Sequence, residues 1–158
     1  MRGISIHVDG ATIGVQHTGA AAIARSPEGY FLGWLSQQLP RMTNNEAEYH
    51  AVLLGLALAN QLGVENVEIV SDSEVVVRQM RGISRVNSAR LKPLHQETCR
   101  AVAQFASVTF KHVPRAQNRL ADALAAEAVN GRSVQMRPHG HNKRSAASHP
   151  LASWLGSG

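Results

Sequence analysis

Four acidic residues lie at predicted boundaries between strands and helices, and they limit the folds open to this chain. Asp9, Glu48, Asp72 and Asp122 are 39, 24 and 50 residues apart, so only tertiary structure can bring them together. Four such acids in one cleft repel one another unless a cation neutralises them. Hard oxygen ligands suit Mg²⁺ or Mn²⁺, and paired metal ions are a common device for phosphodiester cleavage. The sequence therefore favours a fold that gathers these acids at one metal site.

The first part of the chain reads as three strands. Residues 3–9 alternate between apolar and polar side chains, and residues 19–25 and 30–38 are the next two candidates. Pro27-Glu28-Gly29 separates the last two and is a turn signal. We expect these two strands to form a hairpin.

A helix is predicted from Thr43 to Gly63. Thr43-Asn44-Asn45-Glu46 has the form of a capping box, in which Thr43 is the N-cap and Glu46 reaches back to it. Apolar residues follow at helical spacing, and Gly63 is a natural C-terminal stop. Glu48 then lies in the first two turns, where the helix dipole favours an anion.

The rest of the globular part alternates between strands and helices. Strands are predicted at 67–70 and 107–112, and helices at 73–80, at 89–105 and from Asn118, as N-cap, to about residue 129. Pro93 interrupts the second of these helices early, so that helix could begin near Lys92 instead. The later strands are reached through helices, so they should run parallel to the first. This order predicts an α/β fold with a mixed sheet and helices on its faces.

Length and composition fit a small domain with a basic extension. Residues 1–130 form the predicted domain, and residues 131–158 lack clear periodicity and read as a flexible tail. No apolar run is long enough to cross a membrane, and no signal peptide is recognised, so we expect a cytoplasmic protein. Cys99, in a predicted helix, is expected to be a buried and inert thiol. We also expect a monomer.

Charge is distributed unevenly along the chain. Residues 1–77 contain three Arg against eight acids, whereas residues 78–119 contain nine Lys or Arg against one acid. An acidic region beside a basic one fits a cation site next to a polyanion-binding surface. Composition alone leaves open the alternative of a solvated helix face and a basic tail.

Four short motifs, taken in order, resemble type 1 ribonuclease H. They are V-D-G-A at 8–11, T-N-N-E-A-E-Y at 43–49, S-D-S-E-V-V-V-R-Q-M at 71–80, and H-V-P-R-A-Q-N-R-L-A-D at 112–122. Each motif alone is weak, but all four at suitable spacing are a strong signal. The resemblance covers about residues 3–130 and implies the ribonuclease H-like fold, with a five-stranded mixed sheet of three antiparallel and two parallel strands flanked by helices.

The resemblance implies an endonuclease that cleaves the RNA strand of an RNA–DNA hybrid. Asp9, Glu48, Asp72 and Asp122 would hold two Mg²⁺ or Mn²⁺ ions around the scissile phosphate, and the products would carry a 5′-phosphate and a 3′-hydroxyl. Two alternatives remain open at this stage. One is a two-metal nuclease acting on another nucleic acid, and the other is a hybrid-binding module without catalysis.

Further residues are expected at the substrate by the same resemblance. Asn44 and Asn45 lie where the family contacts the minor groove, and Arg41 and Thr43 lie where some members bind a phosphate of the DNA strand. Gly10, Ser73 and Asn118 complete the set expected to bind substrate.

Two features depart from the family pattern or stay open. A mobile histidine that precedes the last acid in many members corresponds to His112, but Arg115 could take its place, and the sequence does not decide between them. The basic protrusion of some members is absent, because only a short loop, about residues 82–90, joins the two helices. The basic residues around this loop are candidates to replace it.

Overall fold

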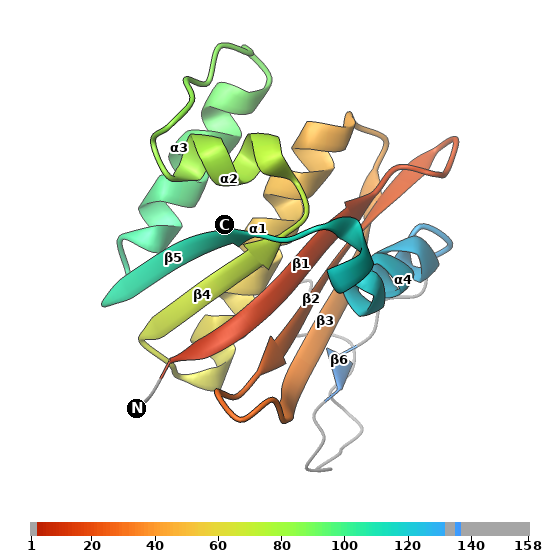
Figure 1. The fold of residues 1–158 in the computed structure, drawn as a ribbon. Helices are drawn as coiled ribbons and strands as arrows, with labels where there is room; N and C mark the ends of the chain where they lie inside the picture. The colour runs from red at the N-terminus through yellow and green to blue at the C-terminus, as the bar shows by residue number, and fades with distance from the viewer. Residues whose placement is uncertain (1–2, 132–134, 137–158) are drawn as a thin grey trace.

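The elements of the chain follow one another in an α/β order (Figure 1). The computed structural model describes residues 3–131 and 135–136. The strands are β1 (Ile4–Ala11), β2 (His17–Arg25), β3 (Phe31–Pro40), β4 (Asn66–Ser71), β5 (Ser107–His112) and β6 (Gln135–Met136). The helices are α1 (Asn44–Leu62), α2 (Glu74–Met80), α3 (Leu91–Val102), the short 3₁₀ turn η1 (Arg115–Gln117) and α4 (Arg119–Ala128).

The sheet has the order β5-β4-β1-β2-β3-β6. Strands β1, β2 and β3 pair antiparallel, while β4 is parallel to β1 and β5 is parallel to β4. This confirms the predicted five-stranded mixed sheet. The short strand β6 adds a sixth member, because residues of the predicted tail pair with Trp34 and Leu35 at the edge of β3. The rest of the tail, residues 132–134 and 137–158, lies outside the described part of the chain.

Helix α1 covers one face of the sheet (Figure 1). Both halves of the predicted capping box are present, since Thr43 accepts a hydrogen bond from the Glu46 backbone and Glu46 accepts one from the Thr43 backbone. Gly63 ends the helix with a φ of 73°, a conformation that glycine adopts without strain. The helix is apolar on most sides because it packs against the sheet on one side and α3 on another.

Helix α4 packs on the opposite face of the sheet, over β1, β2 and β3. The small side chains of β2 permit this close approach from both sides. A Cβ atom on Gly19 would lie only 2.2 Å from the Ala125 carbonyl oxygen of α4. Gly19 therefore fixes how near α4, and the acid it carries, can come to the sheet.

Some predicted boundaries and environments were wrong. The helix predicted at 89–105 is shorter and spans Leu91–Val102, with Pro93 in its first turn, where a missing N–H has no cost. Cys99 is exposed rather than buried, with its Sγ atom 3.8 Å from His95 Nε2. The periodicity identified the helix but not which side of it faces solvent. Among the described residues, no helix is both long and apolar enough to span a bilayer.

Candidate active site

Two of the four acids sit at the carboxyl ends of neighbouring parallel strands. Asp9 lies near the end of β1, and Asp72 directly follows β4. The parallel register pairs Val8 with Ser71, so the next residue on each strand is an acid. Parallel strands end at the same edge of a sheet, and this places the two carboxyl groups side by side.

Glu48 is brought to the same edge by α1 and held there by the backbone of β1. The Gly10 amide donates a hydrogen bond to Glu48 Oε1 over 3.0 Å. A Cβ atom on Gly10 would lie 2.6 Å from the Ala47 carbonyl carbon, so only glycine lets α1 approach this closely. Gly10 thus shapes the site through its lack of a side chain and its free N–H group.

Asp122 is carried by the first turn of α4, and Asn118 ties the start of that helix to β1. The Asn118 side chain was expected to cap α4, but it makes no capping hydrogen bond. Its Nδ2 atom instead donates to the Val8 carbonyl oxygen over 2.9 Å, and the residue is only 2% exposed. Asn118 thus bonds a residue 110 positions away in the chain instead of the first turn of its own helix. Asn118 therefore positions Asp122 beside the strand that carries Asp9.

The carboxyl groups form a compact and electrostatically strained cluster. Oxygen atoms of Asp9, Glu48 and Asp72 lie within 4.8 Å of one another. Burial, followed by the charges of Glu48 and Asp72 and hydrogen bonding with Asp122, raises the pKa of Asp9 to about 9. Burial and the charge of Asp72 raise the pKa of Glu48 to about 8, against the opposing effect of the Gly10 hydrogen bond. Such a cluster suits a divalent cation, which would replace the bound protons.

Arg115 is the basic group that meets the acids. Its Nη2 atom lies 3.4 Å from both carboxylate oxygens of Asp122, and the charges of Asp122 and Asp9 raise its pKa. Its side chain is 77% exposed, so it is free to move. His112, at the end of β5, is also exposed, and no hydrogen bond or ion pair among the described residues joins it to the acids. Of the two candidates that the sequence left open, Arg115 contacts one of the acids in this structure, and which of the two takes part in the reaction stays a prediction.

The residues expected to bind substrate surround the amino-terminal ends of α1 and α2. Arg41 is exposed just before α1, and the Thr12 hydroxyl donates to Asn44 Oδ1, which joins the loop after β1 to the helix. Asn45 is half-buried in the first turn. Ser73 caps α2 by accepting a hydrogen bond from the Val76 amide over 3.3 Å. Several of these side chains therefore have structural partners of their own.

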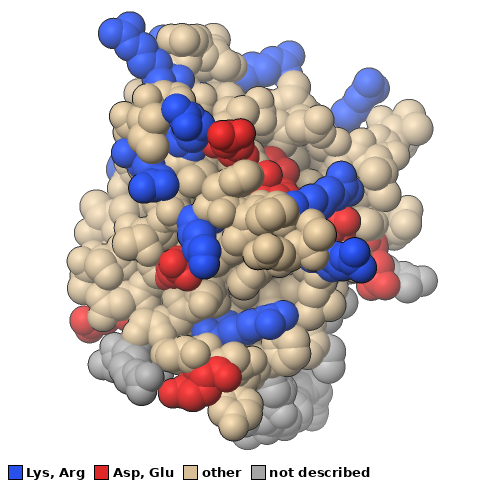
Figure 2. All heavy atoms as spheres, in the orientation of Figure 1, with Lys and Arg blue, Asp and Glu red and all other residues tan. Residues whose placement is uncertain are grey.

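The basic loop at 82–90 is anchored from beneath by a buried polar pair. Tyr49 donates to Gln79 Oε1 over 2.7 Å, and Gln79 Nε2 donates to the Arg85 carbonyl oxygen over 3.3 Å. Arg90 also approaches Glu46, at 3.5 Å. Figure 2 shows Lys and Arg side chains interspersed with Asp and Glu side chains on this face of the molecule. The sequence analysis missed Tyr49 and Gln79, because neither residue type by itself indicates a partner 30 positions away.

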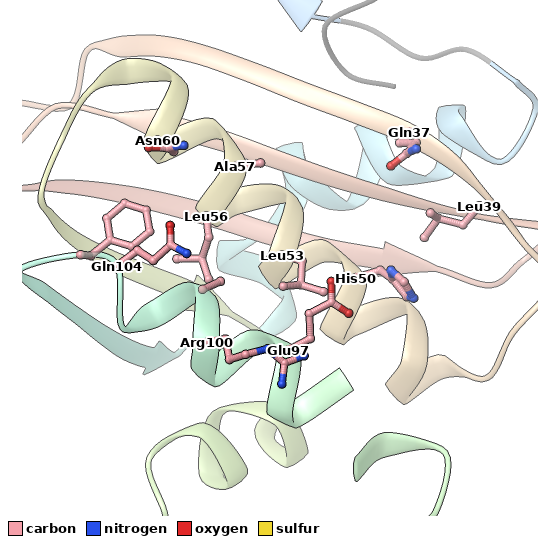
Figure 3. Close-up of a pocket in the computed structure, with 12 residues that line it drawn as sticks. Gln37, Leu39, His50, Leu53, Leu56, Ala57, Asn60, Glu97, Arg100 and Gln104 are labelled. Atoms are coloured by element: carbon pink, nitrogen blue, oxygen red, sulfur yellow. The ribbon is translucent and has the colours of Figure 1, made fainter. Parts of the chain in front are cut away.

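A cavity of about 690 Å³ lies away from the acids, between α1 and α3 (Figure 3). Leu53, Leu56 and Phe105 form apolar walls, and Glu97 and Arg100 lie on its α3 side. Its size exceeds that of other cavities described below, but it contains no cluster of potential metal ligands. We therefore assign the chemistry to the acids and not to this cavity.

Comparison with known proteins agrees with this geometry. Residues 7–128 match a protein family described as Reverse transcriptase-like. A ribonuclease HI of Halobacterium salinarum is 34% identical over 134 residues, which cover 82% of this chain and 66% of that protein. A bifunctional protein of Mycobacterium tuberculosis is 37% identical over 94 residues, or 60% of this chain. That match spans only 26% of the mycobacterial protein, so most of the relative has no counterpart here.

Solved structures give the same result. The crystal structure of the Halobacterium salinarum ribonuclease H1 superposes with a TM-score of 0.79 at 30% identity, covering 83% of this chain and all of that one. The LC11 ribonuclease H1, crystallised in complex with an RNA/DNA hybrid, superposes with a TM-score of 0.76 at 30% identity. That alignment covers 81% of this chain and 97% of the other. The likeness therefore extends over nearly the whole described part of the chain.

Proposed function

This chain belongs to the type 1 ribonuclease H family, and on that premise we propose that it hydrolyses the RNA strand of RNA–DNA hybrids with the help of divalent metal ions. The observation that carries the proposal is the meeting of Asp9, Glu48 and Asp72 within 4.8 Å, with Asp122 beside them. The hybrid bound to the LC11 enzyme supports the choice of substrate class.

The chemistry of the four acids fits Mg²⁺ or Mn²⁺. All potential ligands are carboxylate oxygens, which hard cations prefer, and the pKa of about 9 at Asp9 reflects its burial and the neighbouring charges of Glu48 and Asp72. Asp9, Glu48, Asp72 and Asp122 would hold a pair of ions. When bound, such a pair supplies an activated water and stabilises the leaving 3′ oxygen, which gives 5′-phosphate and 3′-hydroxyl ends.

The chain's own residues have separate tasks around this centre. The Gly10 amide holds one oxygen of Glu48, so the other faces the cluster. Asn118 sets the position of α4 and with it Asp122. Arg115 is the group we assign to charge compensation beside Asp122, because it lies 3.4 Å away, whereas no hydrogen bond or ion pair among the described residues joins His112 to the acids. Arg115→Ala should therefore reduce cleavage more than His112→Ala does.

Recognition of the hybrid is assigned to the surface beside the acids. We place Asn44 and Asn45 at the minor groove, where contacts with 2′-hydroxyl groups distinguish RNA from DNA. Arg41 and Thr43 are placed at a phosphate of the DNA strand, and Ser73 lies near Asp72 on the other side of the cluster. The basic loop at 82–90 extends the positive surface in place of a larger protrusion.

A cleavage assay with four substrates tests this function. Labelled RNA–DNA hybrid, duplex DNA, duplex RNA and single-stranded RNA are incubated with the protein in Mg²⁺, Mn²⁺ or EDTA. We expect cuts only in the RNA of the hybrid and none in EDTA. Cleavage of another substrate would reassign the specificity, and binding of the hybrid without cleavage in either metal would leave a binding module.

Asp72→Asn tests the assignment of the acids. The substitution keeps the shape of the side chain and removes its charge, so the fold should persist while cleavage is lost. Circular dichroism checks the fold, and hybrid cleavage in Mg²⁺ and Mn²⁺ checks the activity. An exposed acid outside the cluster, changed as Glu127→Gln, is the matched control and should retain activity. Full activity of Asp72→Asn would refute the site.

A further inference from the structure

A second, smaller pocket lies on the α4 side of the sheet, next to β1. It has a volume of about 250 Å³. Its lining comes from β1, β2 and the start of α4: His7, Ile23, Arg25, Ala116, Gln117, Asn118, Arg119, Leu120 and Ala121. Ile6 and Val8 belong to the core beneath α1, so alternation along the strand directs His7 to this opposite face. Of the residues proposed for the metal site or its positioning, only Asn118 also lines this pocket.

Three buried polar atoms without a hydrogen-bond partner belong to residues that line it. They are His7 Nδ1, Arg25 Nε and Asn118 Oδ1, and no others of this kind occur among the described residues. Buried side-chain atoms rarely lack a partner, and each costs on the order of 1–3 kcal/mol if nothing satisfies it. Three such atoms from β1, β2 and the turn before α4 indicate that the pocket is built to hold a polar occupant.

The pocket is positively charged. Arg25 and Arg119 line it, and the lining includes no acid. Arg25 itself is held in place by stacking over the Phe31 ring, 4.7 Å from its centroid. A pre-ordered guanidinium in a partly buried site favours an oxyanion.

The unpaired oxygen atom of Asn118 limits the class of anion that the pocket can bind. Asn118 Nδ2 already donates to the Val8 carbonyl, so the remaining Oδ1 atom can only accept a hydrogen bond. The occupant must therefore offer oxygen acceptors to Arg25 and also a donor to Asn118. A phosphate that retains a P–OH group offers both, whereas sulfate and an internal phosphodiester offer no donor.

We propose that this pocket binds a single protonated phosphate group, either as inorganic phosphate or as the monoester end of a nucleotide. Arg25 Nε donates to a phosphate oxygen, and the P–OH group donates to Asn118 Oδ1. His7 Nδ1 forms a hydrogen bond with a remaining oxygen of the phosphate, as donor or acceptor according to the tautomer of the ring. The proposal concerns a site separate from the four acids and does not require that they bind metal or cleave hybrids.

Calorimetric titration in EDTA tests the proposal near pH 6, where phosphate monoesters are about half protonated. The titrants are inorganic phosphate, adenosine 5′-monophosphate and sulfate. Phosphate should bind more tightly than sulfate, and Arg25→Gln should weaken it about tenfold or more, as expected for one charge-assisted hydrogen bond. Arg100→Gln, which removes a basic side chain beside the α1–α3 cavity, should leave binding unchanged.

The outcomes separate the possible occupants. Binding of both phosphate compounds supports a site open to monoester ends, and binding of inorganic phosphate alone supports a site for the free ion. Arg119→Gln changes an exposed side chain and serves as a second test if Arg25→Gln perturbs folding. Equal binding of sulfate, equal binding by Arg25→Gln and Arg100→Gln, or no binding of phosphate would show a pocket filled by water and overturn the proposal. Hybrid cleavage, measured separately, reports on the metal site alone.

Discussion

Replacing Asp9 with Asn should abolish cleavage and at the same time stabilise the metal-free protein. The pKa of Asp9 is raised from 3.8 to about 9, chiefly by burial and then by Glu48 and Asp72. At a pH between its unfolded and folded pKa values, a carboxyl group whose pKa is raised on folding is protonated in the folded state but ionised in the unfolded state. Its contribution to stability is therefore complete below pH 4 and is lost as pH rises towards the folded pKa. An Asn side chain has no such dependence on pH.

The size of the effect follows from two calculations. At about 1.36 kcal/mol per pKa unit, the variant should gain about 4 kcal/mol at pH 7 and about 1.5 kcal/mol at pH 5, measured from the unperturbed pKa of 3.8. Because the carboxylate oxygens lie within 4.8 Å of one another, each repulsion between like charges is worth at least about 3.5 kcal/mol with an effective dielectric constant of about 20. The two values agree in order of magnitude.

Urea denaturation followed by circular dichroism measures this gain in EDTA between pH 5 and pH 9. The difference in unfolding free energy between Asp9→Asn and the unmodified protein should widen steadily with pH. Glu127→Gln removes an exposed acid of α4 and should show no such trend. Adding Mg²⁺ should stabilise the unmodified protein more than the variant, because the variant has lost a ligand. A difference that is zero, or that does not grow with pH, would refute the electrostatic reasoning.

Three further substitutions test other parts of the site. Arg115→Ala should lower kcat at least about tenfold and leave the urea midpoint unchanged, because the exposed guanidinium acts on the charge of the site; unchanged kcat would remove Arg115 from the mechanism. Gly10→Ala should cost about 1–3 kcal/mol of unfolding free energy and most of the activity, because the new Cβ atom overlaps the α1 backbone; a stable and active variant would contradict this. Tyr49→Phe should cost about 1 kcal/mol of unfolding free energy, because it leaves Gln79 without its hydrogen-bond donor. It should also weaken hybrid binding at low salt, because the Arg85 backbone loosens. A variant whose affinity for the hybrid equals that of the unmodified protein across a salt series would exclude this second effect.

Local chemistry made much of the fold predictable. The capping box at Thr43 and Glu46 and the stop at Gly63 depend on neighbours within a few residues, and all appear in the structure. The strand at 107–112 was predicted with its observed limits for the same reason. Such features are encoded by side-chain size, backbone preference and short-range hydrogen bonds.

The sequence could not decide which residues far apart in the chain contact one another. Asn118 has the composition of a helix cap, but a buried carbonyl 110 residues away is its actual partner. Cys99 lies on an amphipathic helix whose orientation depends on how α3 meets α1. His7 and Arg25 meet only because the strand register brings β1 and β2 together, so the pocket between them leaves no motif in the sequence.

One short piece of backbone, residues 8–10 of β1, contacts the elements that carry the clustered acids. The Val8 carbonyl holds the turn before α4, the Gly10 amide holds Glu48, and Asp9 lies between them. A stretch of three residues at the centre of the sheet thus helps to position Asp9, Glu48 and the helix that carries Asp122, and the neighbouring strand β4 positions Asp72. The loop at 82–90 lies outside this stretch, so a change of charge there leaves in place the two hydrogen bonds that hold Glu48 and the start of α4. The positions of the acids and the charge of the neighbouring loop are therefore determined by different parts of one small fold.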